Sequence, residues 1–149
     1  MEIERKFLIR RLPENYTSCP FRQIEQGYLN MDPVVRIRRD SDQYYLTYKS
    51  SGFLTREEYN FPINKESYLH MRDKTDGFLI TKKRYLIPYQ SYMIELDIFE
   101  NHHAPLILAE VEFPTEQEAL AFEPPAWFGR DVTTCPEYTN SYLSRHPIC

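Results

Sequence analysis

Charged and apolar residues alternate with a period of two along several stretches of this 149-residue chain, and this alternation constrains the fold more than any other feature. Glu2, Glu4 and Lys6 share one parity near the N-terminus, while Ile3 and Phe7 share the other. Successive side chains of a β-strand point to opposite faces. The pattern therefore predicts a strand with one charged face and one apolar face.

The same alternation recurs between short segments rich in Asn, Asp, Pro and Gly, which favour turns. We predict strands over residues 2–10, 21–29, 34–39, 44–50, 54–63, 78–87, 92–99 and 106–113. Asn64 suits the N-cap of a helix over 65–74, and the capping-box sequence at 115–118 predicts a second helix that ends near Phe122. We expect one more short helix, over 139–145, in an otherwise irregular tail.

Eight strands joined mostly by short turns are typical of an antiparallel meander that closes on itself, since closure removes exposed strand edges. The aromatic content of 15% also favours strands. We therefore predict a single domain over residues 1–149, mainly β within the α+β class: a closed eight-stranded antiparallel β-barrel with a few short covering helices. The interior of such a barrel has room for side chains or one small ligand.

One face of most of these strands carries charged residues, often as like-charged pairs two residues apart. The acids on these faces are Glu2, Glu4, Glu58, Glu95, Asp97, Glu110 and Glu112. The bases are Lys6, Arg36, Arg38, Lys49, Arg56, Lys82 and Arg84. A solvated sheet face would explain any single strand, but exposed ion pairs contribute only about 0–1 kcal/mol each and give no reason for paired like charges. We predict that the charged faces line the barrel interior and that the apolar faces turn outward, beneath the helices and aromatic side chains or a partner subunit.

Such an interior suits a polyphosphate with a divalent cation. Arg offers forked donors to phosphate oxygens and Lys acts as a point charge. The acid pairs suit hard cations, because Mg²⁺ is typically held by one or two carboxylates together with substrate phosphates. The sequence contains no P-loop motif GxxxxGK[ST] that would bind phosphates in another way.

Charge and cysteine content limit the classes of partner. The net charge of −4 argues against general nucleic-acid binding. Cys19, Cys135 and Cys149 have no metal-type spacing, which favours free thiols in a reducing compartment. We find no signal peptide before the first strand and no apolar run long enough to span a bilayer, so we expect a cytoplasmic protein without a membrane partner, as a monomer or a homodimer.

The chain resembles the CYTH, or triphosphate tunnel metalloenzyme, superfamily, whose N-terminal ExExK signature is matched by Glu2, Glu4 and Lys6. The further matches, in the family's order, are Val35-Arg36-Ile37-Arg38, Leu46-Thr47-Tyr48-Lys49, Arg56-Glu57-Glu58, Lys82-Lys83-Arg84, Glu95-Leu96-Asp97, Ala109-Glu110-Val111-Glu112-Phe113 and Asn140-Ser141-Tyr142-Leu143. The resemblance covers nearly the whole chain and implies a tunnel that binds a linear triphosphate end-on with divalent metal. The short chain looks most like the small bacterial inorganic tripolyphosphatases.

By this resemblance, the residues that hold phosphates are Lys6, Arg36, Arg38, Lys49, Lys82 and Arg84. Arg56 is a further substrate-binding candidate, but it can instead pair with Glu58 or Glu95. The implied metal ligands are Glu2, Glu4, Glu110 and Glu112, with Glu58, Glu95 and Asp97 as further ligands or water-positioning groups. The family's KxR spacing favours Lys82 over Lys83 as the inward-facing lysine.

The predicted reaction is hydrolysis of tripolyphosphate to pyrophosphate and phosphate with two Mg²⁺ or Mn²⁺ ions, and nucleoside triphosphates are further candidate substrates. Glu2, Glu4, Lys6 and Glu58 are the predicted catalytic residues, and one of the three carboxylates accepts the proton of the attacking water. The alternatives are a class IV adenylate cyclase, a thiamine triphosphatase that uses Trp127 as an aromatic platform, and a polyphosphate-binding module without activity. Trp127 is more typical of a core residue, and Tyr28 of aromatic packing at a barrel mouth. The histidines are expected on loop or helix surfaces: His70, His102, His103 and His146.

Overall fold

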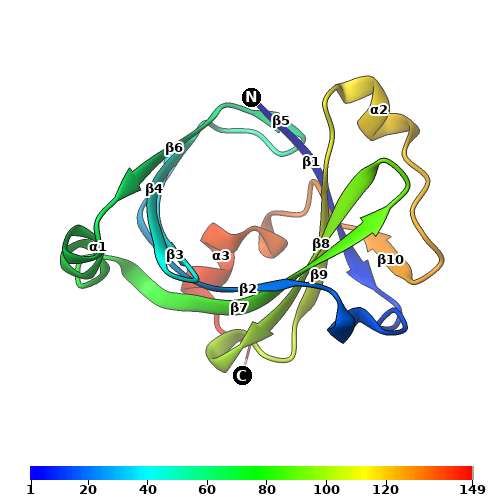
Figure 1. Ribbon diagram of the computed structural model, residues 1–149. Helices are drawn as coiled ribbons and strands as arrows, with labels where there is room; N and C mark the ends of the chain where they lie inside the picture. The colour runs from blue at the N-terminus through cyan, green and yellow to red at the C-terminus, as the bar shows by residue number, and fades with distance from the viewer. Residues whose placement is uncertain (149) are drawn as a thin grey trace.

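A computed structural model describes residues 1–148 and contains one curved antiparallel sheet that wraps into a nearly closed barrel (Figure 1). Its strands are β1 (Glu2–Ile9), β2 (Phe21–Met31), β3 (Val34–Asp40), β4 (Gln43–Lys49), β5 (Thr55–Arg56), β6 (Glu58–Ile63), β7 (Asp76–Tyr89), β8 (Tyr92–Glu100), β9 (Ile107–Glu112) and β10 (Phe128–Asp131). Neighbouring strands follow the order β10-β1-β9-β8-β7-β2-β3-β4-β6, and β5 pairs with the start of β1. The predicted antiparallel barrel is confirmed, with the predicted strand over 54–63 divided into β5 and β6 at Glu57.

The helices occur where the sequence predicts them. They are α1 (Lys65–Arg72), α2 (Glu116–Ala121) and α3 (Asn140–Arg145), with short 3₁₀ turns η1 (Tyr16–Ser18), η2 (Asn101–His103) and η3 (Pro136–Tyr138). The side chain of Asn64 accepts a hydrogen bond from the Ser67 amide at the start of α1, and Thr115 accepts one from the Glu118 amide at the start of α2. Strand β10 and the 3₁₀ turns were not predicted, because segments of three or four residues show no usable periodicity.

The cross-strand register places the charged residues on the inner face of the barrel. Side chains directly opposite one another in antiparallel strands lie on the same face. Glu4 of β1 lies opposite Glu112 of β9, and Arg84 of β7 lies opposite Asp97 of β8. Three of these four residues line a cavity inside the barrel together with charged residues of the other strands. The prediction of a charged interior is therefore confirmed.

The outer apolar face of β1 and β9 is covered by α2 and β10. Phe7, which points outward from β1, packs against Phe128 of β10 with ring centroids 4.7 Å apart. Phe122, at the C-terminal end of α2, packs against both Phe7 and Phe113. Figure 1 shows α2 and β10 together outside the barrel wall, beside β1 and β9. Burial of these rings forms an apolar core outside the sheet. Such a core is required because the charged faces of the strands point inward and the apolar faces point outward.

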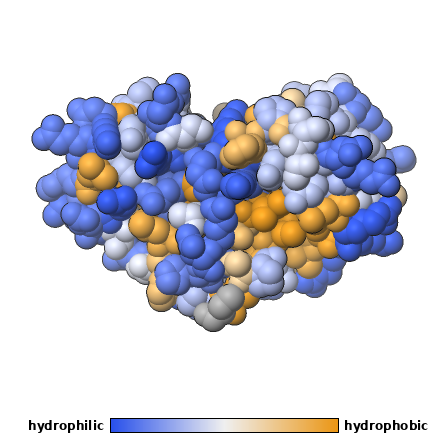
Figure 2. Space-filling model, turned by 60° about the horizontal axis from the view of Figure 1, so that its bottom comes forward, coloured by the Kyte–Doolittle hydropathy of each residue, from blue (hydrophilic) through white to orange (hydrophobic). Residues whose placement is uncertain are grey.

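Helix α1 covers part of the outer face near β3 and β4, where the buried ring of Tyr68 lies 5.1 Å from Tyr44. Other apolar side chains stay exposed, among them Phe21, Tyr59 and Phe61. Figure 2 shows one large apolar area on the face in view, with smaller apolar patches elsewhere among hydrophilic surface. The helices therefore shield the outside of the barrel only in part, as the sequence predicts.

Helix α3 closes one end of the barrel. Leu143 of α3 packs with Val132 and with the inward-facing side chains Ile80, Phe99 and Leu108. In Figure 1, which looks along the barrel, α3 lies within the outline of the strands. The interior is therefore divided into two parts. Leu143 and the side chains packed around it form an apolar plug at this end, and a charged chamber occupies the rest of the barrel toward the other end.

Gly77 of β7 allows α3 to approach the sheet closely. Its φ of +69° lies in the left-handed region, and a Cβ added there would collide with the carbonyl oxygen of Ser144. We expect Gly77→Ala to lower the free energy of unfolding by about 1–3 kcal/mol, because it adds backbone strain and displaces α3. Urea unfolding measures this effect. Gly129→Ala, whose added Cβ would lie 3.3 Å from the Leu8 carbonyl oxygen, should cost less, and an equal or smaller loss in Gly77→Ala would contradict this packing of α3.

The position of one histidine corrects a prediction, whereas the two described cysteines confirm the prediction of free thiols. His103 is buried rather than on the surface, because η2 tucks it beneath α3, where its Nε2 contacts the carbonyl oxygen of Leu143. The other three histidines are exposed. Cys19 and Cys135 are free thiols, and Cys149 lies outside the described residues. None of the helices in the described chain is long and apolar enough to cross a membrane.

Candidate active site

The barrel encloses a cavity of about 190 Å³ whose wall is made almost entirely of charged and polar side chains. Twelve of the fourteen predicted site residues line it. The other two, Lys82 and Asp97, are completely buried behind this lining. Sequence alternation alone thus identified twelve of the thirteen charged residues of the wall, although each residue's role stays a prediction.

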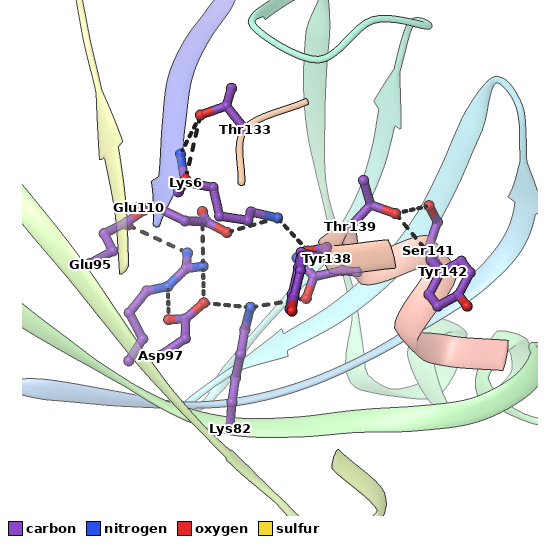
Figure 3. A network of polar contacts seen from close by, with 12 residues as sticks. Lys6, Lys82, Glu95, Asp97, Glu110, Thr133, Tyr138, Thr139, Ser141 and Tyr142 are labelled. Atoms are coloured by element: carbon purple, nitrogen blue, oxygen red, sulfur yellow. Dashed lines mark hydrogen bonds and ion pairs between the residues drawn. The ribbon is translucent and has the colours of Figure 1, made fainter. Parts of the chain in front are cut away.

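A chain of alternating charges runs through the floor of the cavity (Figure 3). Lys82 Nζ lies 2.7 Å from Asp97, and Arg84 donates to the same carboxylate from Nε at 2.8 Å and from Nη2 at 2.9 Å. Arg84 also lies 3.6 Å from Glu110, which Lys6 Nζ approaches to 3.4 Å. Burial alone would raise the pKa of Asp97 and Glu110, but the neighbouring cations outweigh it and lower both. These two acids are therefore ionised and neutralised by protein bases.

The C-terminal segment is tied to this floor through two lysines. Lys6 Nζ donates to the carbonyl oxygen of Tyr138 at 3.0 Å, and Lys82 Nζ donates to Oδ1 of Asn140 at 3.4 Å. Thr139, Asn140 and Ser141 join the lining of the cavity. Burial lowers the pKa of Lys82 to about 8, although Asp97 opposes the shift. Residues 139–141 therefore form part of the wall.

A second group of ion pairs joins β1 to β4 and β6. Lys49 Nζ lies 3.0 Å from Glu2 and 3.0 Å from Glu58. Arg56 Nε lies 3.4 Å from Glu2, which is its cross-strand partner between β5 and β1. The predicted alternatives, in which Arg56 pairs with Glu58 or with Glu95, are thus wrong. The register of β5 on β1 places Arg56 opposite Glu2 instead.

These ion pairs make the free energy of unfolding depend on pH in the acidic range. Burial alone would raise the pKa of Glu58, but Lys49 outweighs it and lowers the pKa from 4.5 to about 2. A lowered carboxyl pKa stabilises the fold above about pH 4.5, and this contribution is lost as the pH falls toward 2. We expect Glu58→Gln to make urea unfolding less pH-dependent in this window, by at most about 1.4 kcal/mol per pH unit. Identical pH slopes in the variant and the wild type would contradict the Glu58–Lys49 pair.

Two acids on the wall have no basic partner. Glu4 and Glu112 lie directly opposite one another on β1 and β9, and neither side chain makes a hydrogen bond or ion pair within residues 1–148. Burial, reinforced by Glu110, raises the pKa of Glu4 to about 7. Burial, reinforced by Glu58, raises the pKa of Glu112 as well. Like charges directly across a strand pair destabilise each other, so this position favours a cation.

Two bases on the wall have no acidic partner. Arg36 donates to Thr47 Oγ1 at 3.3 Å, and its buried Nε has no partner in the described chain. Arg38 donates from Nε to Gln26 Oε1 at 2.8 Å. Burial, reinforced by Arg36, lowers the pKa of Arg38 to about 9. Within residues 1–148 neither guanidinium has a carboxylate within ion-pair distance, so both are available to a buried anion.

The unpaired acids and bases face each other across the chamber. Three strands separate β9 from β3 in one direction around the barrel (β8, β7 and β2), and β1, β5–β6 and β4 separate them in the other. Glu112 of β9 therefore lies on the wall opposite Arg36 and Arg38 of β3. The chamber combines a wall that favours a cation with a wall that favours an anion.

The acids alone do not form a preassembled metal centre. In the described chain, no group of three or more Asp, Glu, His or Cys side chains is arranged to hold a metal ion. Five of the seven predicted acids are paired with Lys or Arg, and within residues 1–148 the side chains of the other two, Glu4 and Glu112, are not. This arrangement fits a cation held by one or two carboxylates and completed by substrate oxygens.

The CYTH domain model matches residues 1–134. The chain belongs to the CYTH family. It is 40% identical over 149 residues to an inorganic triphosphatase of Nitrosomonas europaea, covering 96% of each chain. It is 34% identical over 152 residues to an inorganic triphosphatase of Acetivibrio thermocellus, covering 98% of this chain and 94% of that one. A crystal structure of an inorganic triphosphatase matches this CYTH protein with a TM-score of 0.72 and 36% identity, covering 97% and 94% of the two chains.

Sequence reasoning missed one base of the CYTH chamber, whereas its assignments of Lys82 and Trp127 are confirmed. Arg22 of β2 lines the cavity, and its shared parity with Gln26 and Tyr28 was the signal that could have found it. Lys83 points outward over the ring of Phe21, so Lys82 is the inward lysine, as expected. Trp127 packs against Phe128 in the outer core, which confirms its core assignment and removes it as a platform inside the tunnel.

Proposed function

We propose that this CYTH protein hydrolyses inorganic triphosphate to pyrophosphate and phosphate in the presence of Mg²⁺ or Mn²⁺. The observation that carries the proposal is the pair of unpaired arginines, Arg36 and Arg38, opposite the unpaired carboxylates Glu4 and Glu112 in one closed-ended chamber. The names of its two relatives, both inorganic triphosphatases, support the same activity.

The basic wall is suited to the phosphate chain. Arg36 and Arg38 are rigid forked donors without a competing carboxylate, so a polyphosphate can take up their free N–H groups. Lys6, Lys49 and Arg84 are already paired with acids, and they can exchange part of this pairing for phosphate oxygens. Triphosphate carries on the order of four negative charges near neutral pH, and this basic wall offsets the repulsion that it exerts on an attacking nucleophile.

The acidic wall fits a divalent cation. Glu4 and Glu112 would hold it first, because within residues 1–148 no Lys or Arg lies within ion-pair distance of them. Glu2, Glu58, Glu95 and Glu110 would contribute once phosphate draws their basic partners away. When bound, one or two such ions would neutralise phosphate charge and supply an activated water.

The chain's own residues would then orient and deprotonate the nucleophile. Of the predicted catalytic carboxylates Glu2, Glu4 and Glu58, Glu4 alone has no ion pair in the described chain, so it is the one that would accept a proton from water beside the cation. Lys6 lies two residues from Glu4 on the same face, with its Nζ fixed by Tyr138 and Glu110. This position allows Lys6 to stabilise negative charge that develops on a phosphate oxygen near Glu4.

One assay separates this function from its alternatives. Purified protein is incubated with tripolyphosphate, ATP or thiamine triphosphate, each with Mg²⁺, Mn²⁺ or EDTA, and phosphate, pyrophosphate and cyclic AMP are measured. We expect phosphate release to be fastest from tripolyphosphate and to stop in EDTA. Pyrophosphate with cyclic AMP from ATP would instead identify a cyclase, and binding without turnover of any substrate would identify a binding module.

A further inference from the structure

Arg22 is a base of the chamber wall that none of the matched family motifs contains. It lies on the inner face of β2, directly opposite Arg84 of β7, and it lines the cavity. Within the described chain its charged partner is Asp40, at 3.4 Å from one Nη. The two side chains are 45% and 17% exposed, so this is a surface ion pair that a ligand can displace at little cost.

The position of Arg22 along the barrel marks the open end of the chamber. Along the inner face of β7, Ile80 belongs to the apolar plug, and Lys82 and Arg84 follow it toward the other end. Along β7 the exposed side-chain fraction rises from 0% for Lys82 to 7% for Arg84, and Arg22, level with Arg84 on β2, is 45% exposed. Arg22 is therefore the base at the mouth.

The plug determines which end of a substrate reaches this mouth. Leu143 and the inward side chains around it fill the opposite end of the barrel. A small side pocket beside Gly52 and Phe53 has a volume of about 20 Å³, enough for roughly one water molecule and too small for a nucleoside. We therefore expect a triphosphate attached to an organic group to place that group at the exposed Arg22 mouth rather than in the plug or in this pocket.

We propose that Arg22 is a specificity-determining residue that binds the outer terminal phosphate of inorganic triphosphate and thereby favours it over nucleoside triphosphates. This proposal rests on the proposed function and deepens it. An unesterified terminal phosphate has a second pKa of about 6, so it carries nearly two charges at neutral pH. In a nucleoside triphosphate the phosphate at this end is esterified, carries one charge, and leads into a ribose that occupies the space beside Arg22.

The test measures binding without turnover. Isothermal titration calorimetry in EDTA compares tripolyphosphate with ATP for the wild type, Arg22→Ala and Arg22→Lys. We expect Arg22→Ala to weaken tripolyphosphate binding by about tenfold and ATP binding by less than about threefold, because only the terminal phosphate loses a charge-assisted contact. Arg22→Lys should lie between, since it keeps the charge and loses the forked donors. Arg39→Ala is the matched control, because Arg39 neighbours Asp40 but points outward and bonds the carbonyl of Ser41.

Turnover with Mg²⁺ gives a second measurement. The ratio of kcat/KM for tripolyphosphate to that for ATP should fall by about three- to tenfold in Arg22→Ala, mainly through KM. Equal losses for both substrates, or no loss for tripolyphosphate, would overturn the role of Arg22. Binding differences of the expected size without phosphate release by the wild type would overturn the proposed hydrolysis and leave the role of Arg22 standing.

Discussion

Replacing Glu4 with glutamine is expected to lower kcat for tripolyphosphate by about a thousandfold while leaving the protein at least as stable as the wild type. Glu4 is a buried carboxylate without a basic partner, and Glu110 and Glu2 add to the rise of its pKa beyond that caused by burial. A neutral amide of the same shape removes this repulsion. It also removes the group that would accept the proton of water and the negative charge that would attract a cation.

The opposite signs of these two effects make the test specific. Phosphate release and the midpoint of urea unfolding are measured on the same preparations of wild type and Glu4→Gln. Glu14→Gln, a change of the same chemistry at an exposed turn, is the control and should alter neither quantity. A Glu4→Gln variant that retains full activity, or that loses activity only because it unfolds, would contradict the assignment of Glu4 to the site.

Arg38→Ala is expected to lower kcat/KM for tripolyphosphate by about a hundredfold or more, because Arg38 offers a buried guanidinium that no carboxylate neutralises. The fold should survive. Loss of the bond to Gln26 costs roughly 1 kcal/mol, and relief of repulsion from Arg36 and Arg84 offsets it.

Arg39→Ala is the matched control for this variant too, because the two arginines are neighbours on β3 that point to opposite faces. Arg39 lies opposite Glu25 of β2 on the outer face of the barrel, whereas Arg38 lies opposite Gln26 of β2 on the inner face. Steady-state kinetics on both variants, with circular dichroism to verify folding, should show a large loss only for Arg38→Ala. Comparable losses in both would mean that net charge, rather than a position inside the chamber, sets activity.

The alternation of charged and apolar residues with a period of two was enough to predict most of the strands and most charged residues of the chamber wall. Because register in a closed barrel cannot slip by one residue without exposing the apolar face, parity alone placed Glu4, Glu112, Arg36 and Arg38 inside. Parity cannot say which acid meets which base. The partner of Arg56 depends on the two-residue strand β5 and its register on β1, and a segment that short leaves no periodic signal.

The plug was the feature least accessible to sequence reasoning. Helix α3 has six residues, and its main buried contact is a single leucine, Leu143. Its place in the barrel depends on tertiary contacts with Ile80, Phe99 and Leu108, which follow the charged positions on their strands and look like ordinary core residues. His103 was misplaced for the same reason, since tertiary contacts with Leu143 of α3 and with the ring of Phe99 bury it.

Phosphorus NMR of tripolyphosphate with purified protein and Mg²⁺ tests the central claim most directly. We expect the tripolyphosphate resonances to be replaced by those of pyrophosphate and phosphate in equal molar amounts, at a rate that EDTA, Glu4→Gln or Arg38→Ala reduces to background. Tripolyphosphate that stays intact under these conditions, in protein that folds and binds it, would contradict the assignment of this chamber to triphosphate hydrolysis.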